Sequence, residues 1–66
     1  MRLTKREQQI VVLIRRGWAN RQIARKFGTT ERTVKNQLTT IYAKCGVANR
    51  LQLAVRAHRK KLTLST

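Results

Sequence analysis

The chain has 66 residues, of which 16 are Lys or Arg and only two, Glu7 and Glu31, are acidic, so its formal net charge is +14. A chain of this length forms one domain at most and buries only about 60% of its unfolded surface, so it needs efficient packing. The lone cysteine, Cys45, excludes an internal disulfide. The longest apolar run, residues 10–14, is too short to span a membrane. The charge favours a polyanionic partner, and nucleic-acid phosphate is the commonest.

Capping residues and glycines divide the first half of the chain into two predicted helices. The first begins at Thr4, which has capping-box spacing to Glu7, and it ends at Gly17. The second runs from a cap at Asn20 to a stop at Gly28. Apolar residues at helical spacing predict their inward faces: Ile10, Leu13 and Ile14 in the first, and Ile23, Ala24 and Phe27 in the second.

The third predicted helix runs from a cap at Thr29 or Thr30 to about Cys45, and its apolar residues form one narrow stripe of Val34, Leu38, Ile41 and Cys45. The opposite face carries Arg32, Asn36, Thr39 and Ala43, with Lys35 and Thr40 on its flanks. Beyond the first turn of the helix this outer face carries short side chains, whereas exposed helix faces usually carry long Glu and Lys side chains, which indicates that a partner approaches the helix closely. Trp18 and Tyr42 are expected to pack on the core or its edge rather than to stack on bases.

A fourth helix is predicted from a cap at Asn49, and it has two apolar sides. One side carries Leu51, Ala54, Val55 and His58, and the other carries Leu53 and Ala57. Two apolar faces need two partners, of which one is the core and the other could be a second copy of the chain. The sequence alone does not decide which side is which.

The second and third helices have the spacing of a helix-turn-helix, because Ala24 precedes Gly28 by four residues and Val34 follows it by six. At this point residues 3–57 resemble the DNA-binding domain of LuxR/NarL/FixJ/GerE-type transcription regulators. The matching motifs are Leu3-Thr4-x-x-Glu7, Gly17-x-x-Asn20-x-x-Ile23-Ala24, Thr33-Val34-Lys35, Ile41-x-x-Lys44-x-Gly46-Val47 and Asn49-Arg50. Three positions depart from common family residues, namely Gln22, Gln37 and Thr39, and these departures concern the target sequence rather than the fold.

The resemblance implies an all-α, four-helix domain whose third helix is the recognition helix and whose fourth commonly forms the dimer contact. It implies sequence-specific binding of double-stranded DNA by a bacterial transcription regulator that is cytoplasmic and nucleoid-associated. We expect the domain to occupy residues 1–58 and a basic, flexible tail residues 59–66. Because the chain begins directly at the helical domain, it resembles the stand-alone GerE-like form or a C-terminal fragment of a response regulator.

Side-chain chemistry assigns roles to individual residues of the predicted interface. In the major groove Lys can donate to guanine, Asn can pair with adenine and a Thr methyl can meet that of thymine, so Lys35, Asn36 and Thr39 are the predicted base contacts. The predicted phosphate contacts are Arg21, Arg25, Thr30, Arg32, Thr33, Lys44 and Arg50. The predicted homodimer interface is formed by Leu51, Ala54, Val55 and His58.

Catalysis is not expected, because both glutamates are explained by helix starts and the chain has no Asp to pair with His58. Cys45 and His58 alone cannot bind zinc, and neither a cofactor, a small-molecule ligand nor a membrane is an expected partner. Three alternatives remain: a nonspecific DNA- or RNA-binding basic protein, a membrane-active cationic protein, and a regulator that acts by dimerising with another regulator.

Overall fold

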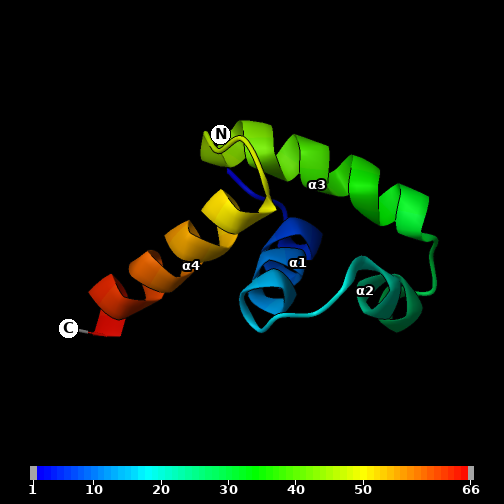
Figure 1. The fold of residues 1–66 in the computed structure, drawn as a ribbon, viewed down its shortest axis with the longest axis horizontal. Helices are drawn as coiled ribbons and strands as arrows, with labels where there is room; N and C mark the ends of the chain where they lie inside the picture. The colour runs from blue at the N-terminus through cyan, green and yellow to red at the C-terminus, as the bar shows by residue number, and fades with distance from the viewer. Residues whose placement is uncertain (1, 66) are drawn as a thin grey trace.

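The computed structural model describes the backbone of residues 2–65 and the side chains of residues 2–58. Within that range the chain is all-α, with no strand, as predicted. Four helices follow one another (Figure 1): α1 (Lys5–Arg15), α2 (Asn20–Phe27), α3 (Glu31–Cys45) and α4 (Arg50–Ser65).

Three helix starts have the predicted caps. At the start of α1 the Thr4 hydroxyl accepts a hydrogen bond from the Glu7 backbone N–H at 3.1 Å, and the Thr4 N–H donates to the Glu7 carboxylate at 2.7 Å. The Thr30 hydroxyl accepts from the N–H three residues on at 3.1 Å, and the Asn49 side chain does the same at 2.9 Å. These bonds satisfy backbone donors that have no partner inside the helix.

The predicted cap of α2 is wrong by one residue. Ala19 occupies the cap position, and its N–H donates to the Gln22 side chain at 2.8 Å. Asn20 is instead the first helical residue, and its side-chain oxygen accepts a hydrogen bond from Arg50 at 2.6 Å. The asparagine therefore joins two helices rather than capping one.

The turn between α2 and α3 depends on a glycine in the left-handed conformation. Gly28 has a φ of 65°, which costs a side-chain-bearing residue energy but not glycine. The N–H groups of Gly28 and Thr29 donate back to the carbonyls of Arg25 and Ala24 at 3.3 and 2.9 Å. These bonds close α2 as the predicted spacing required and direct the chain into α3.

The helices pack as two pairs, α1 with α4 and α2 with α3, and α1 lies at the centre beneath α3 (Figure 1). The buried core consists of the predicted inward residues of the first three helices together with Leu53: Ile10, Leu13, Ile14, Ile23, Ala24, Val34, Leu38, Ile41 and Leu53. Phe27 and Cys45 are half-buried at its edge, as are Trp18 and Tyr42. The prediction of core or edge packing for both aromatic residues is therefore confirmed.

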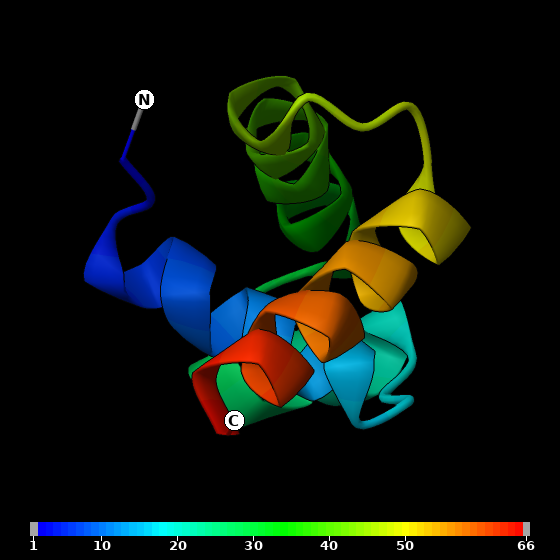
Figure 2. The same ribbon diagram turned by 90° about the vertical axis from the view of Figure 1, so that its left-hand side faces the viewer.

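Helix α4 lies across the molecule with one face on the core and another in solvent (Figure 2). Its helical backbone continues through Ser65, beyond residue 58, where the predicted domain ends and the predicted tail begins. The side chains of residues 59–66 and the backbone of residue 66 lie outside the described residues. The predicted flexibility of the segment 59–66 therefore stays a prediction.

Candidate nucleic-acid interface

The outward face of α3 is exposed along its length. Lys35, Asn36 and Thr39, the predicted base contacts, all have exposed side chains, and so do Arg32 and Ala43. The Thr39 hydroxyl donates to the carbonyl of Lys35 at 3.2 Å, so its hydrogen is already used within the helix. Thr39 offers a partner its methyl group and its hydroxyl lone pairs. Because the exposed side chains in the middle of α3 are short, a large partner can come close to the helix backbone there.

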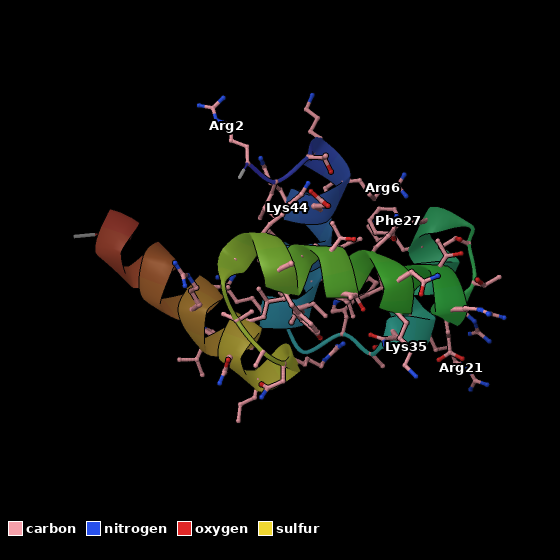
Figure 3. All side chains as sticks on the ribbon, turned by 90° about the horizontal axis from the view of Figure 1, so that it is seen from above. Arg2, Arg6, Arg21, Phe27, Lys35 and Lys44 are labelled. Carbon is pink, nitrogen blue, oxygen red and sulfur yellow. The ribbon has the colours of Figure 1, made fainter. Side chains whose placement is uncertain are left out.

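Cations and hydroxyls border this face at the α2 end. Arg21 and Arg25 of α2 are exposed, and Figure 3 shows Arg21 and Lys35 pointing to the same side of α3. At the start of α3 the Thr30 hydroxyl donates to the Thr33 hydroxyl at 3.1 Å. Thr33 consequently keeps its own hydroxyl hydrogen for an anionic partner near the helix N-terminus, where the helix dipole also favours negative charge.

Lys44, a predicted phosphate contact, lies in a different environment. Its ammonium donates to the Glu7 carboxylate at 2.8 Å, and the two side chains are only 17% and 11% exposed. The hydrogen bond from Lys44, followed by that from the Thr4 backbone, holds the pKa of Glu7 below its ordinary value of 4.5. The pair connects α1 to the C-terminal turn of α3, so much of the Lys44 charge is compensated inside the protein.

Arg50, another predicted phosphate contact, is also held internally. Its guanidinium donates to the Asn20 side chain at 2.6 Å and to the carbonyl of Trp18. Arg50 therefore fixes the start of α4 to the loop and first residue of α2. The sequence gives no sign of these two contacts, because Glu7 and Lys44 are separated by 37 positions and Asn20 and Arg50 by 30.

The structure distinguishes the two apolar sides of α4. Leu53 is 1% exposed in the core, whereas Leu51 is 73% and Val55 47% exposed. His58 is exposed as well, but Ala54, the fourth predicted dimer residue, is half-buried against the core. An open groove runs along the exposed side, lined by Val47, Leu51, Gln52, Val55 and Arg56.

The described part of the chain supports neither a metal site nor a membrane-spanning helix. No group of three or more His, Cys, Asp or Glu side chains among the described residues is placed to hold a metal ion. Of the helices between residues 2 and 65, none is both long enough and apolar enough to span a bilayer.

The fold and the exposed α3 face define a helix-turn-helix domain with a basic surface. Residues 1–57 match the family described as bacterial regulatory proteins, luxR family, and the chain belongs to this family. The membership confirms the family resemblance seen in the sequence and the prediction that the domain is not an enzyme.

Several curated relatives are similar to this chain over most of its length. The transcriptional regulatory protein LiaR of Bacillus subtilis is 45% identical over 60 residues, which are 91% of this chain and 28% of LiaR. The probable transcriptional regulatory protein SgaR of Hyphomicrobium methylovorum is 43% identical over 85% of this chain and 26% of its own length. The regulator MalT of Yersinia pestis is 39% identical over 86% of this chain and 6% of its own length. The chain thus spans less than a third of each of these relatives.

Proposed function

We propose that this domain binds double-stranded DNA sequence-specifically by inserting α3 into the major groove, and that it acts in bacterial transcription regulation. The observation that carries the proposal is the exposed face of α3, where short side chains are bordered by cations that have no carboxylate partner among residues 2–58. A helix fits the major groove, which is about 12 Å wide. The names of LiaR and MalT as transcriptional regulators support the same function.

Three exposed side chains of α3 are the proposed base contacts. Lys35 donates to guanine O6 and N7, Asn36 pairs bidentately with adenine, and Thr39 places its methyl group against that of thymine. This role for Thr39 agrees with the internal hydrogen bond of its hydroxyl. Each well-formed bidentate pair discriminates against the wrong base by about 1–3 kcal/mol.

Phosphate contacts supply the larger, sequence-independent part of the affinity. The exposed candidates are Arg21, Arg25, Thr30, Arg32 and Thr33. Lys44 and Arg50 contribute mainly by holding the helices in place, because both are engaged internally. Each neutralised phosphate lowers the slope of log affinity against log salt by about 0.9.

We further propose that two copies pair through α4 and occupy two half-sites about one helical turn apart. Leu51, Val55 and His58 form the exposed centre of that interface, and Ala54 lies at its base. The domain comprises residues 1–58, and its site of action is the bacterial cytoplasm, where the DNA lies.

Selection of random duplex DNA by the purified protein tests the proposal. The expected result is a motif of two half-sites that keeps its advantage over a scrambled duplex at physiological salt. Asn36→Ala should then lower the ratio of specific to nonspecific affinity, whereas Arg21→Ala should weaken binding to both duplexes alike. The absence of a motif would show that charge alone drives binding, and equal effects of the two variants would contradict the division into base and phosphate contacts.

A further inference from the structure

A second group of cations lies outside every contact described above. Arg2, Lys5 and Arg6, here called the N-terminal basic cluster, all have exposed side chains. The single ion pair among residues 2–58 joins Lys44 to Glu7, so no carboxylate of the described residues neutralises this cluster. Lys5 and Arg6 belong to the first turn of α1, where cations are unfavourable next to the positive end of the helix dipole. The charges of Lys5 and Arg6 are therefore not placed there to stabilise α1 through its dipole.

The cluster lies beside α3, on the side opposite to Arg21. Seen from above α3, the side chains of Arg2 and Arg6 lie on one side of this helix, and those of Lys35 and Arg21 lie on the other (Figure 3). In the view of Figure 2 the segment before α1 rises beside α3 to a similar height. Cations therefore border α3 on both sides.

Arg6 is also held in a defined orientation. Its guanidinium carbon lies 4.1 Å from the centre of the Phe27 ring at the end of α2, a cation–π contact. Because the side chain is already ordered against this ring, less conformational entropy is lost when the guanidinium binds an anion. The planar guanidinium forms paired hydrogen bonds with phosphate oxygens, which makes phosphate its natural partner.

A helix in the major groove has a phosphate backbone on each side. The groove is about 12 Å wide, and a helix with its side chains measures about 10–12 Å across, so both backbones come within reach. Arg21 lies on one side of α3. On the other side the ammonium of Lys44 is held by Glu7, whereas the N-terminal basic cluster has no carboxylate partner among residues 2–58.

We propose that the N-terminal basic cluster binds phosphates of the DNA strand opposite to the one that Arg21 contacts. The inference rests on the proposed insertion of α3 into the major groove. It adds a second line of backbone contacts and makes α1 part of the DNA-binding surface. The two lines of contacts together fix the rotation of α3 within the groove, on which base readout by Lys35 and Asn36 depends.

The test is a salt series on the selected duplex with Arg2→Gln, Arg6→Gln and the double variant. Each single substitution should reduce the magnitude of the log–log salt slope by about 0.9 and the double substitution by about 1.8. Arg16→Gln is the matched control, because Arg16 is exposed at the far end of α1 and its substitution removes the same charge. Slopes for Arg2→Gln and Arg6→Gln that equal those of the wild type and of the control would overturn the inference.

Two variants, the additional Arg6→Lys and the Arg2→Gln already named, separate charge from folding. Arg6→Lys keeps the charge and should keep the slope, while Arg2→Gln leaves the contact between Arg6 and Phe27 intact. Thermal unfolding followed by circular dichroism shows which variants are folded. If Arg6→Gln does not fold, the salt slope of Arg2→Gln alone decides whether the cluster binds phosphates.

Duplexes with one neutral methylphosphonate test the strand assignment. Neutralising a phosphate bound by the cluster should weaken binding of the wild type but not of the double variant. Neutralising a phosphate bound by Arg21, on the other strand, should still weaken binding of the double variant. Sensitive phosphates on the same strand for both groups would overturn the assignment. A wild type without any preferred motif would instead refute the proposed function itself, so the two failures are distinguishable.

Discussion

Two leucines of α4, Leu51 and Leu53, are two residues apart and differ completely in environment, so they offer a sharp test of the fold and of the proposed dimer. Leu53 is 1% exposed in the core and Leu51 is 73% exposed. We expect Leu53→Ala to destabilise the folded chain strongly and Leu51→Ala to leave the monomer almost unchanged. The two substitutions remove the same atoms, so any difference reports on the surroundings alone.

The size of the effect follows from burial. Truncating a fully buried leucine to alanine costs about 3 kcal/mol or more, since it removes transfer free energy and leaves a cavity. A chain of 66 residues has a free energy of unfolding of about 3–10 kcal/mol, so Leu53→Ala removes a large share of it. The corresponding fall in Tm is about 12 °C or more for a domain of this size. A substitution at an exposed site such as Leu51 stays within about 0.5 kcal/mol.

Urea unfolding at several protein concentrations measures both effects. At low concentration, where the chain is monomeric, only Leu53→Ala should shift the unfolding midpoint. At high concentration a dimer through α4 stabilises the wild type by mass action, and Leu51→Ala should lose that additional stability. Equal destabilisation by both substitutions in the dilute protein would refute the described packing of α4. A wild-type midpoint independent of concentration, with no difference at Leu51, would refute the dimer.

Substitutions at three other positions, Glu7, Thr30 and Gly28, test the contacts that hold α3 in place. The Glu7 pKa is lowered in the folded chain, chiefly by Lys44 and then by Thr4, so its contribution to stability is complete above its ordinary pKa of 4.5 and is lost as the pH falls through the lowered value. The stability difference between the wild type and Glu7→Gln, measured by urea midpoints across this pH range, should therefore shrink on acidification, and a constant difference would contradict the role of the pair. Thr30→Ala removes the cap of α3 and should cost about 1 kcal/mol in the same assay, while an unchanged midpoint would show that the cap is not needed. Gly28→Ala should also cost about 1 kcal/mol, because the φ of 65° is strained for alanine although an added Cβ would meet nothing within 4 Å; Gly28→Asn should cost less, and the reverse order would refute a purely backbone effect.

Local sequence signals predicted the elements of this fold well. A cap followed by an apolar stripe and a glycine depends only on neighbouring residues, so the starts of α1, α3 and α4 and the turn at Gly28 could be identified. The narrow stripe of α3 likewise predicted which side of that helix is exposed. The cap of α2 was misplaced because Asn20 is a typical capping residue by type, whereas its actual partner, Arg50, lies 30 positions away.

The candidate site was predictable to the extent that it follows helix periodicity. Exposure of Lys35, Asn36 and Thr39 follows from the α3 stripe and is confirmed, although their roles on DNA stay predictions. The internal engagement of Lys44 was not predictable, because it depends on how α1 packs against α3. The side of α4 that packs on the core could not be predicted either. Both sides carry apolar residues, and only the packing of the helices places Leu53 inside.

The distribution of charge in this domain separates the contacts that fold it from those available to a partner. The net charge of +14 must oppose folding through self-repulsion, yet two of its cations are turned inward as links between helices. Lys44 connects α3 to α1 through Glu7, and Arg50 connects α4 to α2. The exposed cations on both sides of α3 have no carboxylate partner in the described part of the chain, so nothing within that part offsets their repulsion. Under the proposed function, DNA phosphates that lie along α3 relieve this repulsion. Because only the folded chain gathers these cations on one surface, it should bind the polyanion more tightly than the unfolded chain does and gain stability by mass action. Positive charge that weakens the isolated domain is, on this argument, the same charge that strengthens its complex with DNA.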